Sequence, residues 1–403
     1  MSSLRRLSTR RLASLTGGAL ALIAAAAVLA SSALSSGGAV PPAKPLAAAI
    51  HDALAAPAVS GLTARIAFTD KLVDSSILPT GSPLLKGGTG RLWASADGRA
   101  RLELQSDNGD TQIVLTPQRV TLYDQQSDAV YQALLPADRA GAATGNDAAD
   151  GVPTIADIQR RLADAMGHLQ VSGATPGNVH GISAYTVRVA PARDGGLVGG
   201  AELAWDAATG VPLRAAVYQQ GGAKPVLELA ITDLNYGSVS PADLGVTPPA
   251  GAKVTTVDLR DQASGGDAGS AHHQVGEPKT LAAAAKAVPF TLSAPATLAG
   301  MRRGGVRVVG RDSADRGVLV TYGTGLGGLA VLETAADPEA SAPAKKDTGG
   351  EQGGLPQPSI NGNPGQELST ALGTGVRFTR SGVRYVVVGS VRQAVAEAAA
   401  RGL

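Results

Sequence analysis

The chain has 403 residues, 44% of them hydrophobic and 3% aromatic, with a formal net charge of +2 and no cysteine. This length allows two domains, and the missing cysteine excludes disulfides and a lipidated N-terminal cysteine. The scarcity of aromatic stacking platforms and the absence of a basic face in the sequence pattern argue against nucleic-acid binding.

Residues 1–40 are predicted to be an export signal. An apolar stretch, Ala19–Leu34, follows four arginines and precedes small residues: the arginines are Arg5, Arg6, Arg10 and Arg11. This order is typical of a secretory signal peptide. The stretch is shorter than the roughly 20 residues that a spanning helix needs, but an uncleaved N-terminal membrane anchor remains the alternative. Both readings place the rest of the chain outside the cytoplasm, in the cell envelope.

Residues 44–256 predict a first domain rich in strands. Apolar and polar residues alternate in four stretches, 62–69, 99–105, 184–189 and 226–232. Turn signals such as Asp97-Gly98 and Asn108-Gly109 separate the strands. This pattern predicts an antiparallel sheet with one face exposed to water.

Two helices are predicted to cover the apolar face of this sheet. The first, Leu46–Ala55, places Leu46, Ile50 and Leu54 on one stripe. The second, Thr154–Leu169, carries Ile155, Ile158, Leu162 and Met166 on its stripe, with Thr154 as N-cap and Asp157 three residues later.

The most distinctive segment is Ala201–Arg214, AELAWDAATGVPLR. Asp206 and Thr209 can accept backbone hydrogen bonds in a tight turn, and Gly210 can adopt the positive φ that such a turn requires. Pro212 suits the first position of a strand. The segment therefore predicts a β-hairpin. Its pattern W-D-x-x-T-G-x-P-L-R also resembles a hairpin of the exported LolA/RseB-like proteins.

Three further segments resemble the same family, in the same order along the chain: Gly90–Trp93, Val179–Pro191 and Val246–Val254. The resemblance implies an α+β fold, in which a curved antiparallel half-barrel carries covering helices and a smaller α+β domain follows. It also implies a protein that binds lipid or lipoprotein acyl chains and performs no covalent chemistry. One departure is Ala96, which stands where lipoprotein carriers have an arginine that latches the helical lid.

Ten residues are predicted to line an apolar binding site: Leu62, Ile66, Phe68, Leu102, Leu104, Tyr185, Val187, Leu203, Trp205 and Leu229. Core residues and lining residues are of the same types, so the sequence leaves open whether the concave face encloses a cavity or a packed core.

The C-terminal part predicts a flexible linker, 257–285, and a second domain, 286–403, with a disordered insertion at 334–367. The linker and the insertion are polar and rich in small residues. Tyr322–Glu333, Gly382–Gly389 and the helix Arg392–Ala400 resemble the second domain of RseB/MucB proteins. This layout implies a sensor that binds an anti-sigma factor or another membrane protein.

No catalytic, metal or cofactor site is predicted. The sequence contains no G-x-S-x-G, Walker or H-E-x-x-H motif, and no acidic residue is spaced to complete a metal site with its histidines. These are His51, His168, His180, His272 and His273. A non-enzymatic sensor is the first reading and a lipid or lipoprotein carrier the second. An envelope hydrolase is the third, because a catalytic triad can assemble from distant residues.

Overall fold

The computed structural model describes residues 40–73, 83–107, 109–125, 128–135, 152–246, 249, 251–258, 280–310, 316–336 and 355–403. The predicted leader lies outside these ranges, except for Val40. Within them, no helix is long and apolar enough to cross a membrane.

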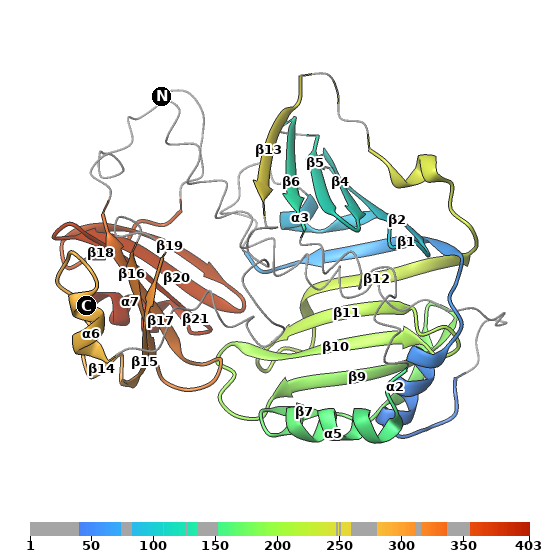
Figure 1. The fold of residues 1–403 in the computed structure, drawn as a ribbon, viewed down its shortest axis with the longest axis horizontal. Coiled ribbons are helices and arrows are strands. Elements are labelled where there is room, and N and C mark those ends of the chain that lie inside the picture. Colours follow the sequence, from blue (N-terminus) through green and yellow to red (C-terminus); the bar gives the residue numbers. More distant parts are fainter. Residues whose placement is uncertain are drawn as a thin grey trace.

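The chain forms two sheets with few helices (Figure 1). The strands of the first sheet are β1 (Gly61–Asp70), β2 (Gly88–Ser95), β3 (Ala100–Ser106), β4 (Gly109–Thr116), β5 (Arg119–Asp124), β6 (Ala129–Leu134), β7 (Leu169–Val171), β8 (Thr175–Val179), β9 (Ile182–Pro191), β10 (Val198–Asp206), β11 (Pro212–Gln219), β12 (Pro225–Tyr236) and β13 (Lys253–Asp258). Their order is β13-β6-β5-β4-β3-β2-β1-β12-β11-β10-β9-β7, and β8 also pairs with β9. Two short elements, α3 (Pro83–Lys86) and the 3-10 helix η3 (Pro241–Leu244), lie in its connections.

The second sheet has the order β14-β15-β16-β17-β21-β20-β19-β18. Its strands are β14 (Thr297–Leu298), β15 (Met301–Val309), β16 (Gly317–Tyr322), β17 (Leu329–Ala335), β18 (Ser359–Ile360), β19 (Asn363–Thr370), β20 (Gly373–Arg380) and β21 (Val383–Gly389). Two helices belong to this half, α6 (Leu281–Lys286) and α7 (Gln393–Arg401). The predicted fold class, a curved antiparallel sheet with covering helices and a smaller α+β domain, is confirmed. One edge departs from it, because β13 pairs with β6 in parallel.

The predicted hairpin is β10 and β11, and its turn is tied into the sheet. The Asp206 carboxylate accepts the Ala208 N–H at 2.8 Å, and the Thr209 hydroxyl accepts the Val211 N–H at 3.3 Å. The Tyr236 hydroxyl, from β12, donates to Asp206 at 2.5 Å. Gly210 has φ +72°, and a Cβ there would lie 2.6 Å from the Ala53 carbonyl oxygen. The motif therefore has a structural role: it lets the first helix sit directly on the hairpin.

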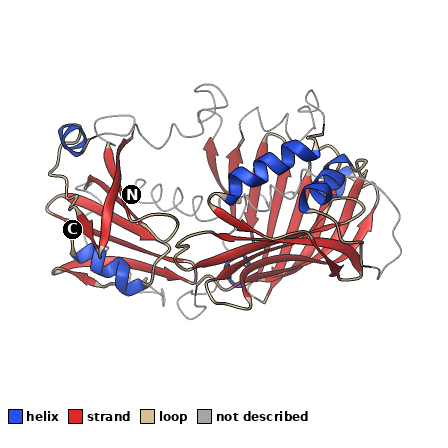
Figure 2. Cartoon of the chain, turned by 90° about the horizontal axis from the view of Figure 1, so that it is seen from below, coloured by secondary structure: helices blue, strands red, loops and turns tan. Residues whose placement is uncertain are grey.

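Both helices of the first domain form where they were predicted, α2 at Leu46–Ala55 and α5 at Ile155–Met166. Thr154 and Asp157 form the predicted capping box. Figure 2 shows both helices on one side of the curved first sheet.

The predicted buried faces of these helices were wrong in part. In α2 the alanines Ala47, Ala49 and Ala53 are buried, whereas Leu46, Ile50 and Leu54 are half-buried. In α5 only Ile158 is buried. Ile155 and Met166, at its two ends, are 41% and 56% exposed. Small side chains let α2 approach the sheet closely, while α5 covers little of it.

Two predicted segment boundaries need correction. The linker 257–285 includes the end of β13 and all of α6, whose N-cap Thr280 accepts the Ala283 N–H. The predicted disordered insertion, 334–367, is too long, because the end of β17, the whole of β18 and the first part of β19 lie within it. Strand pairing satisfies the backbone hydrogen-bonding groups of these residues, although many of their side chains are polar. Residues 337–354 lie outside the described ranges, so disorder there stays a prediction.

Candidate functional site

The concave face of the first sheet is apolar from one strand to the next. Strand register aligns Ile66 with Ile231 and Phe68 with Leu229, across β1 and β12. On β10, Leu203 faces both Val187 and Ala215. Because side chains alternate along a strand, these residues share the face that α2 and α5 only partly cover.

This face holds a cavity of about 380 Å³. Its size lies within the range of about 300–1,000 Å³ that is usual for small-molecule sites. Strands β1–β4 and β9–β12 line it together. Leu203, which lies within it, is 39% exposed, which is unusual for a leucine on the inner face of a sheet. The concave face is therefore not a fully packed core.

The charged side chains of the same strands lie on the opposite face. Arg214 bonds Glu202 at 2.8 Å and Glu228 at 2.5 Å, and the Tyr218 hydroxyl bonds Glu202 at 2.7 Å. Burial alone would lower the pKa of Arg214, but the bonds from Glu202, Tyr218 and Glu228 outweigh it and raise the pKa. Arg188 completes this cross-strand network, 2.9 Å from Glu202. The cavity is thus lined almost entirely by uncharged, apolar side chains.

The structure brings most of the predicted lining residues together. Those at the cavity are Leu62, Ile66, Phe68, Leu102, Val187, Leu203 and Leu229. The other three are elsewhere. Leu104 is 1% exposed in the core of the same sheet, and Tyr185 and Trp205 pack with Ala49 and Ala53 under α2. Those three residues pack behind or beside the residues that line the cavity and do not line it themselves.

Sequence reasoning missed a group of lining residues on β11 and its neighbours: Val189, Ala201, Leu213, Ala215, Val217, Leu227 and Ile231. Leu213, Ala215 and Val217 alternate with Arg214, Ala216 and Tyr218. That alternation was a usable signal, although alanines weaken it.

Ala96 lies at the cavity itself, just after β2. Its N–H donates to the Ser60 carbonyl oxygen at 3.3 Å. An alanine offers no charged donor here, so no side-chain latch to the helices starts from this position.

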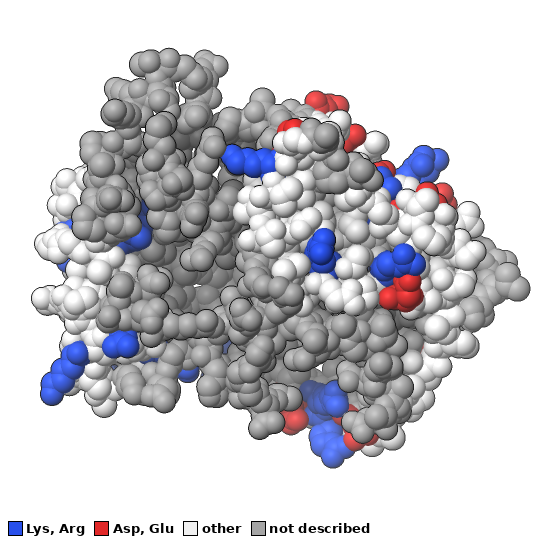
Figure 3. Space-filling model, turned by 45° about the horizontal axis from the view of Figure 1, so that its top comes forward, with Lys and Arg blue, Asp and Glu red and all other residues white. Residues whose placement is uncertain are grey.

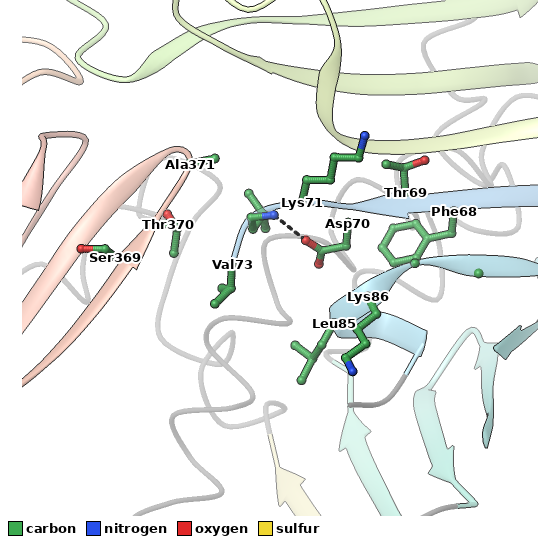
Figure 4. A pocket seen from close by; sticks show the side chains of 13 residues that line it. Phe68, Thr69, Asp70, Lys71, Val73, Leu85, Lys86, Ser369, Thr370 and Ala371 are labelled. Atoms are coloured by element: carbon green, nitrogen blue, oxygen red, sulfur yellow. Dashed lines mark hydrogen bonds between the residues drawn. The ribbon is translucent and has the colours of Figure 1, made fainter. Parts of the chain in front are cut away.

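A second cavity, of about 840 Å³, lies between the two sheets (Figure 4). It is bordered by the end of β1, by α3 and the start of β2, and by the β19–β20 turn. Phe68 lines both cavities. Asp70 accepts the Leu72 N–H at 2.8 Å, and burial raises the pKa of its carboxyl. Ala371 donates its N–H to the Leu72 carbonyl oxygen at 2.7 Å, which joins the two halves of the chain here.

The loop between β9 and β10 also contacts the second half. The Leu197 N–H donates to Ser390, whose carbonyl oxygen is 3.0 Å and whose hydroxyl is 2.9 Å away. The Ser390 hydroxyl donates to the Leu372 carbonyl oxygen at 2.8 Å, and the Gly195 carbonyl oxygen lies 3.2 Å from it. The Gly327 N–H donates to the Asp194 carbonyl oxygen at 3.2 Å. Two strands that line the apolar cavity are therefore anchored directly to the second domain.

The two ends of the Tyr322–Glu333 segment lie in the core of the second domain, whereas Leu326 is 54% exposed. Tyr322 and Glu333 are 1% and 0% exposed. Burial raises the pKa of Glu333 to about 7, and the Ser293 N–H, 2.9 Å away, and Arg380 oppose that shift only in part. Within the described part of the chain, no three His, Asp or Glu side chains gather closely enough to hold a metal ion. His272 and His273 lie outside the described ranges.

Comparisons with known proteins gave a limited result. No protein-family model matches the chain, and no curated protein matches it. Among solved structures, MucB in complex with MucA(peri) is 17% identical, covering 84% of this chain and 91% of that one, with a TM-score of 0.39. The Pseudomonas aeruginosa MucA/MucB complex is 16% identical, covering 88% and 94%, with a TM-score of 0.40.

A putative outer membrane lipoprotein-sorting protein domain from Vibrio parahaemolyticus is 13% identical, covering 46% of this chain and 89% of that one, with a TM-score of 0.15.

Proposed function

We propose that this protein is an exported, non-enzymatic binder of an apolar chain, a lipid or the acyl chains of a lipoprotein, and that it signals to a membrane partner. The open apolar cavity on the concave face carries the proposal. Each methylene that moves from water into such a site contributes about 0.8 kcal/mol. Glu202 and Arg214, the two charged residues at the cavity, pair with each other at 2.8 Å and the rest of the lining is uncharged, which favours an acyl chain over a polar metabolite.

The contacts between the halves support the signalling part. Val187, Val189, Ala201 and Leu203 line the cavity on β9 and β10, and the loop joining these strands bonds Ser390 and Gly327. A chain that separates β9 and β10 from the helices would displace this loop. By linkage, a partner that binds one arrangement of the domains must change lipid affinity by the same factor as lipid changes partner affinity. An anti-sigma factor is the partner that the sequence resemblance implies.

A carrier that moves lipid or lipoprotein between membranes is the second candidate. Ala96 disfavours it, because a carrier needs a lid that closes over its cargo, and this position supplies no charged latch. An envelope hydrolase is the third candidate, and no set of residues in the described ranges favours it.

Native mass spectrometry of the protein after gentle extraction from its own envelope tests the proposal. We expect a co-purified mass adduct of lipid size that is lost on mild organic extraction. Protein that carries no adduct and takes up no added acyl lipid would refute the binding function. Stable transfer of lipid between vesicles without any protein partner would favour the carrier.

A further inference from the structure

One face of β1 runs from the apolar cavity into the cavity between the two sheets. Side chains at alternate positions share a face of a strand, so Leu62, Ile66, Phe68 and Asp70 form one row. The first three line the apolar cavity, Phe68 lines both cavities, and Asp70 lines only the cavity between the sheets. In register with Asp70 is Leu227, which also lines the apolar cavity. The two cavities are therefore neighbours along one strand, and the row changes from apolar to charged just after Phe68.

The cavity between the sheets carries charge of both signs. Its wall includes one carboxylate, Asp70, and two amines, Lys71 and Lys86, beside several aliphatic residues. Figure 4 shows the Asp70 carboxylate pointing toward the side of the cavity formed by Ser369–Ala371, whereas Lys71 and Lys86 extend away from it in opposite directions. This cavity can therefore meet a ligand group of either sign, which the apolar cavity cannot do.

Asp70 has no cation partner among the described residues. Exposed carboxylates of the first domain have cations at hand: Figure 3 shows both signs of charge over one face of it, and Asp97 pairs with Arg99 at 2.7 Å. Asp70 is half-buried, and within the described ranges its one hydrogen bond comes from the Leu72 N–H at 2.8 Å. Burial without a counter-charge raises the pKa of its carboxyl. A carboxylate can accept up to about four hydrogen bonds, so Asp70 retains capacity for a cationic donor.

We propose that the cavity between the sheets binds the zwitterionic head group of the same amphiphile whose acyl chain fills the apolar cavity. The ammonium group of the head donates to the Asp70 carboxylate, because a charge-assisted hydrogen bond is stronger than a neutral one. The phosphate of the head lies toward Lys71 and Lys86, since an ammonium on a flexible stem can turn to meet it. Phe68 marks the boundary between the chain and the head.

The head group would contact both domains at once. Ser369, Thr370 and Ala371, from the β19–β20 turn, line this cavity together with the end of β1. Ala371 also donates its N–H to the Leu72 carbonyl oxygen at 2.7 Å, two residues after Asp70. A bound head group therefore lies beside a bond that joins the two halves. This inference rests on the proposed function, because the acyl chain occupies the apolar cavity.

Isothermal titration calorimetry with two lysophospholipids of the same acyl chain tests the head-group site on the full chain. Lysophosphatidylethanolamine carries an ammonium group and a phosphate. Its N-acetyl derivative keeps the phosphate and the chain but has no positive charge. Below their critical micelle concentrations, we expect wild-type protein to bind the first lipid about tenfold more tightly than the second, because only the first can donate a charged hydrogen bond to Asp70. This comparison requires no variant, so it stands even if a variant does not fold.

Asp70→Asn should abolish the tenfold preference for the ethanolamine lipid. The amide oxygen of asparagine can still accept the Leu72 N–H, so this substitution removes the charge and keeps the local hydrogen bond. Asp164→Asn, at an exposed position of α5, is the matched control and should keep the preference. Lys71→Gln combined with Lys86→Gln should weaken both lipids equally, by roughly threefold, because both lipids contain the phosphate.

Leu203→Arg tests whether the chain and the head belong to one ligand. It should abolish binding of both lipids, since it blocks the apolar cavity. Ethanolamine lipid that still binds to this variant would mean that the head binds without the chain, which overturns the shared site. Equal binding of the two lipids by wild-type protein, or an unchanged preference in Asp70→Asn, would overturn the head-group site and leave the apolar site standing. Wild-type protein that binds neither lipid would overturn the proposed function and the head-group site together.

Discussion

The two sheets of this protein cover their apolar faces in different ways. In the second domain, Ala396, Ala399 and Ala400 of α7 pack against the sheet, and all three are fully buried. In the first domain, α5 buries only Ile158, and the strands line a cavity to which neither α2 nor α5 contributes a lining residue. Every sheet must cover its apolar face, but only the second does so by close packing. Incomplete cover is what makes the first domain a candidate binding site.

The largest expected difference between the closely packed second domain and the open first domain is in the cost of removing a phenylalanine side chain. Phe378 stacks on Tyr385, with ring centroids 4.8 Å apart, in the closed core. Phe68 lies between the two cavities. We expect Phe378→Ala to reduce the free energy of unfolding of its domain by about 3–5 kcal/mol, and Phe68→Ala to cost only about 1–2 kcal/mol, because its surroundings are already open.

Urea denaturation can follow the two domains separately. Both tryptophans, Trp93 and Trp205, lie in the first domain, so tryptophan fluorescence reports on that domain and circular dichroism reports on both. Equal costs for the two substitutions would mean that the first domain is as closely packed as the second.

A second test uses pH, because the closed core contains a buried carboxyl. The pKa of Glu333 is about 7 in the folded protein and near 4.5 when unfolded. The folded state therefore retains a proton that the unfolded state releases, so the contribution of Glu333 to stability is largest below about pH 4.5 and is lost as pH rises through 7. Between pH 5 and 8 we expect the second domain to lose about 2–3 kcal/mol.

Glu333→Gln should remove most of that dependence. Glu397→Gln is the control, since bonds from Arg401 and Gln393 lower the pKa of Glu397 and give the opposite sign. A wild-type unfolding midpoint that stays constant from pH 5 to 8 would show that Glu333 is solvated.

A smaller effect is expected where the domains meet. Ser390→Ala deletes the hydroxyl that accepts the Leu197 N–H at 2.9 Å between the two halves and donates to the Leu372 carbonyl oxygen within the second, a loss of about 1 kcal/mol. Spin labels at Val254→Cys and Leu355→Cys should show a broader distance distribution in this variant. Ser172→Ala removes a comparable bond inside the first domain and should leave the distribution unchanged. An unchanged distribution in Ser390→Ala would mean that this contact does not hold the domains together.

Much of the fold could be predicted because local signals agreed with each other. The turn chemistry of Asp206, Thr209 and Gly210 predicts the hairpin, and Thr154 with Asp157 predicts the start of α5. The buried face of α2 could not be predicted from hydrophobicity, because contact with the hairpin at Gly210 selects Ala53 and Ala49 over larger side chains. The parallel pairing of β13 with β6 joins residues more than 100 positions apart, which no local pattern encodes.

The candidate site, too, has features that a local pattern predicts and features that depend on tertiary packing. Period-two alternation predicts which face Phe68 and Leu229 occupy. It cannot predict that Tyr185 and Trp205, on the same face, end up under α2, because that depends on where the helix packs. It also cannot separate a cavity from a core, since this depends on how much of the face α5 covers.

The central claim, that the first domain holds an open site for an acyl chain, is tested most directly with Leu203→Arg. Binding of the fluorescent fatty acid cis-parinaric acid and urea unfolding are measured on the same samples, with Val254→Arg as the control for an exposed apolar residue of the same domain. Because Leu203 is already 39% exposed, its replacement should weaken binding at least tenfold and lower the free energy of unfolding by less than about 1.5 kcal/mol. Wild-type protein that does not bind the probe, or a variant that loses folding and binding together, would contradict the account.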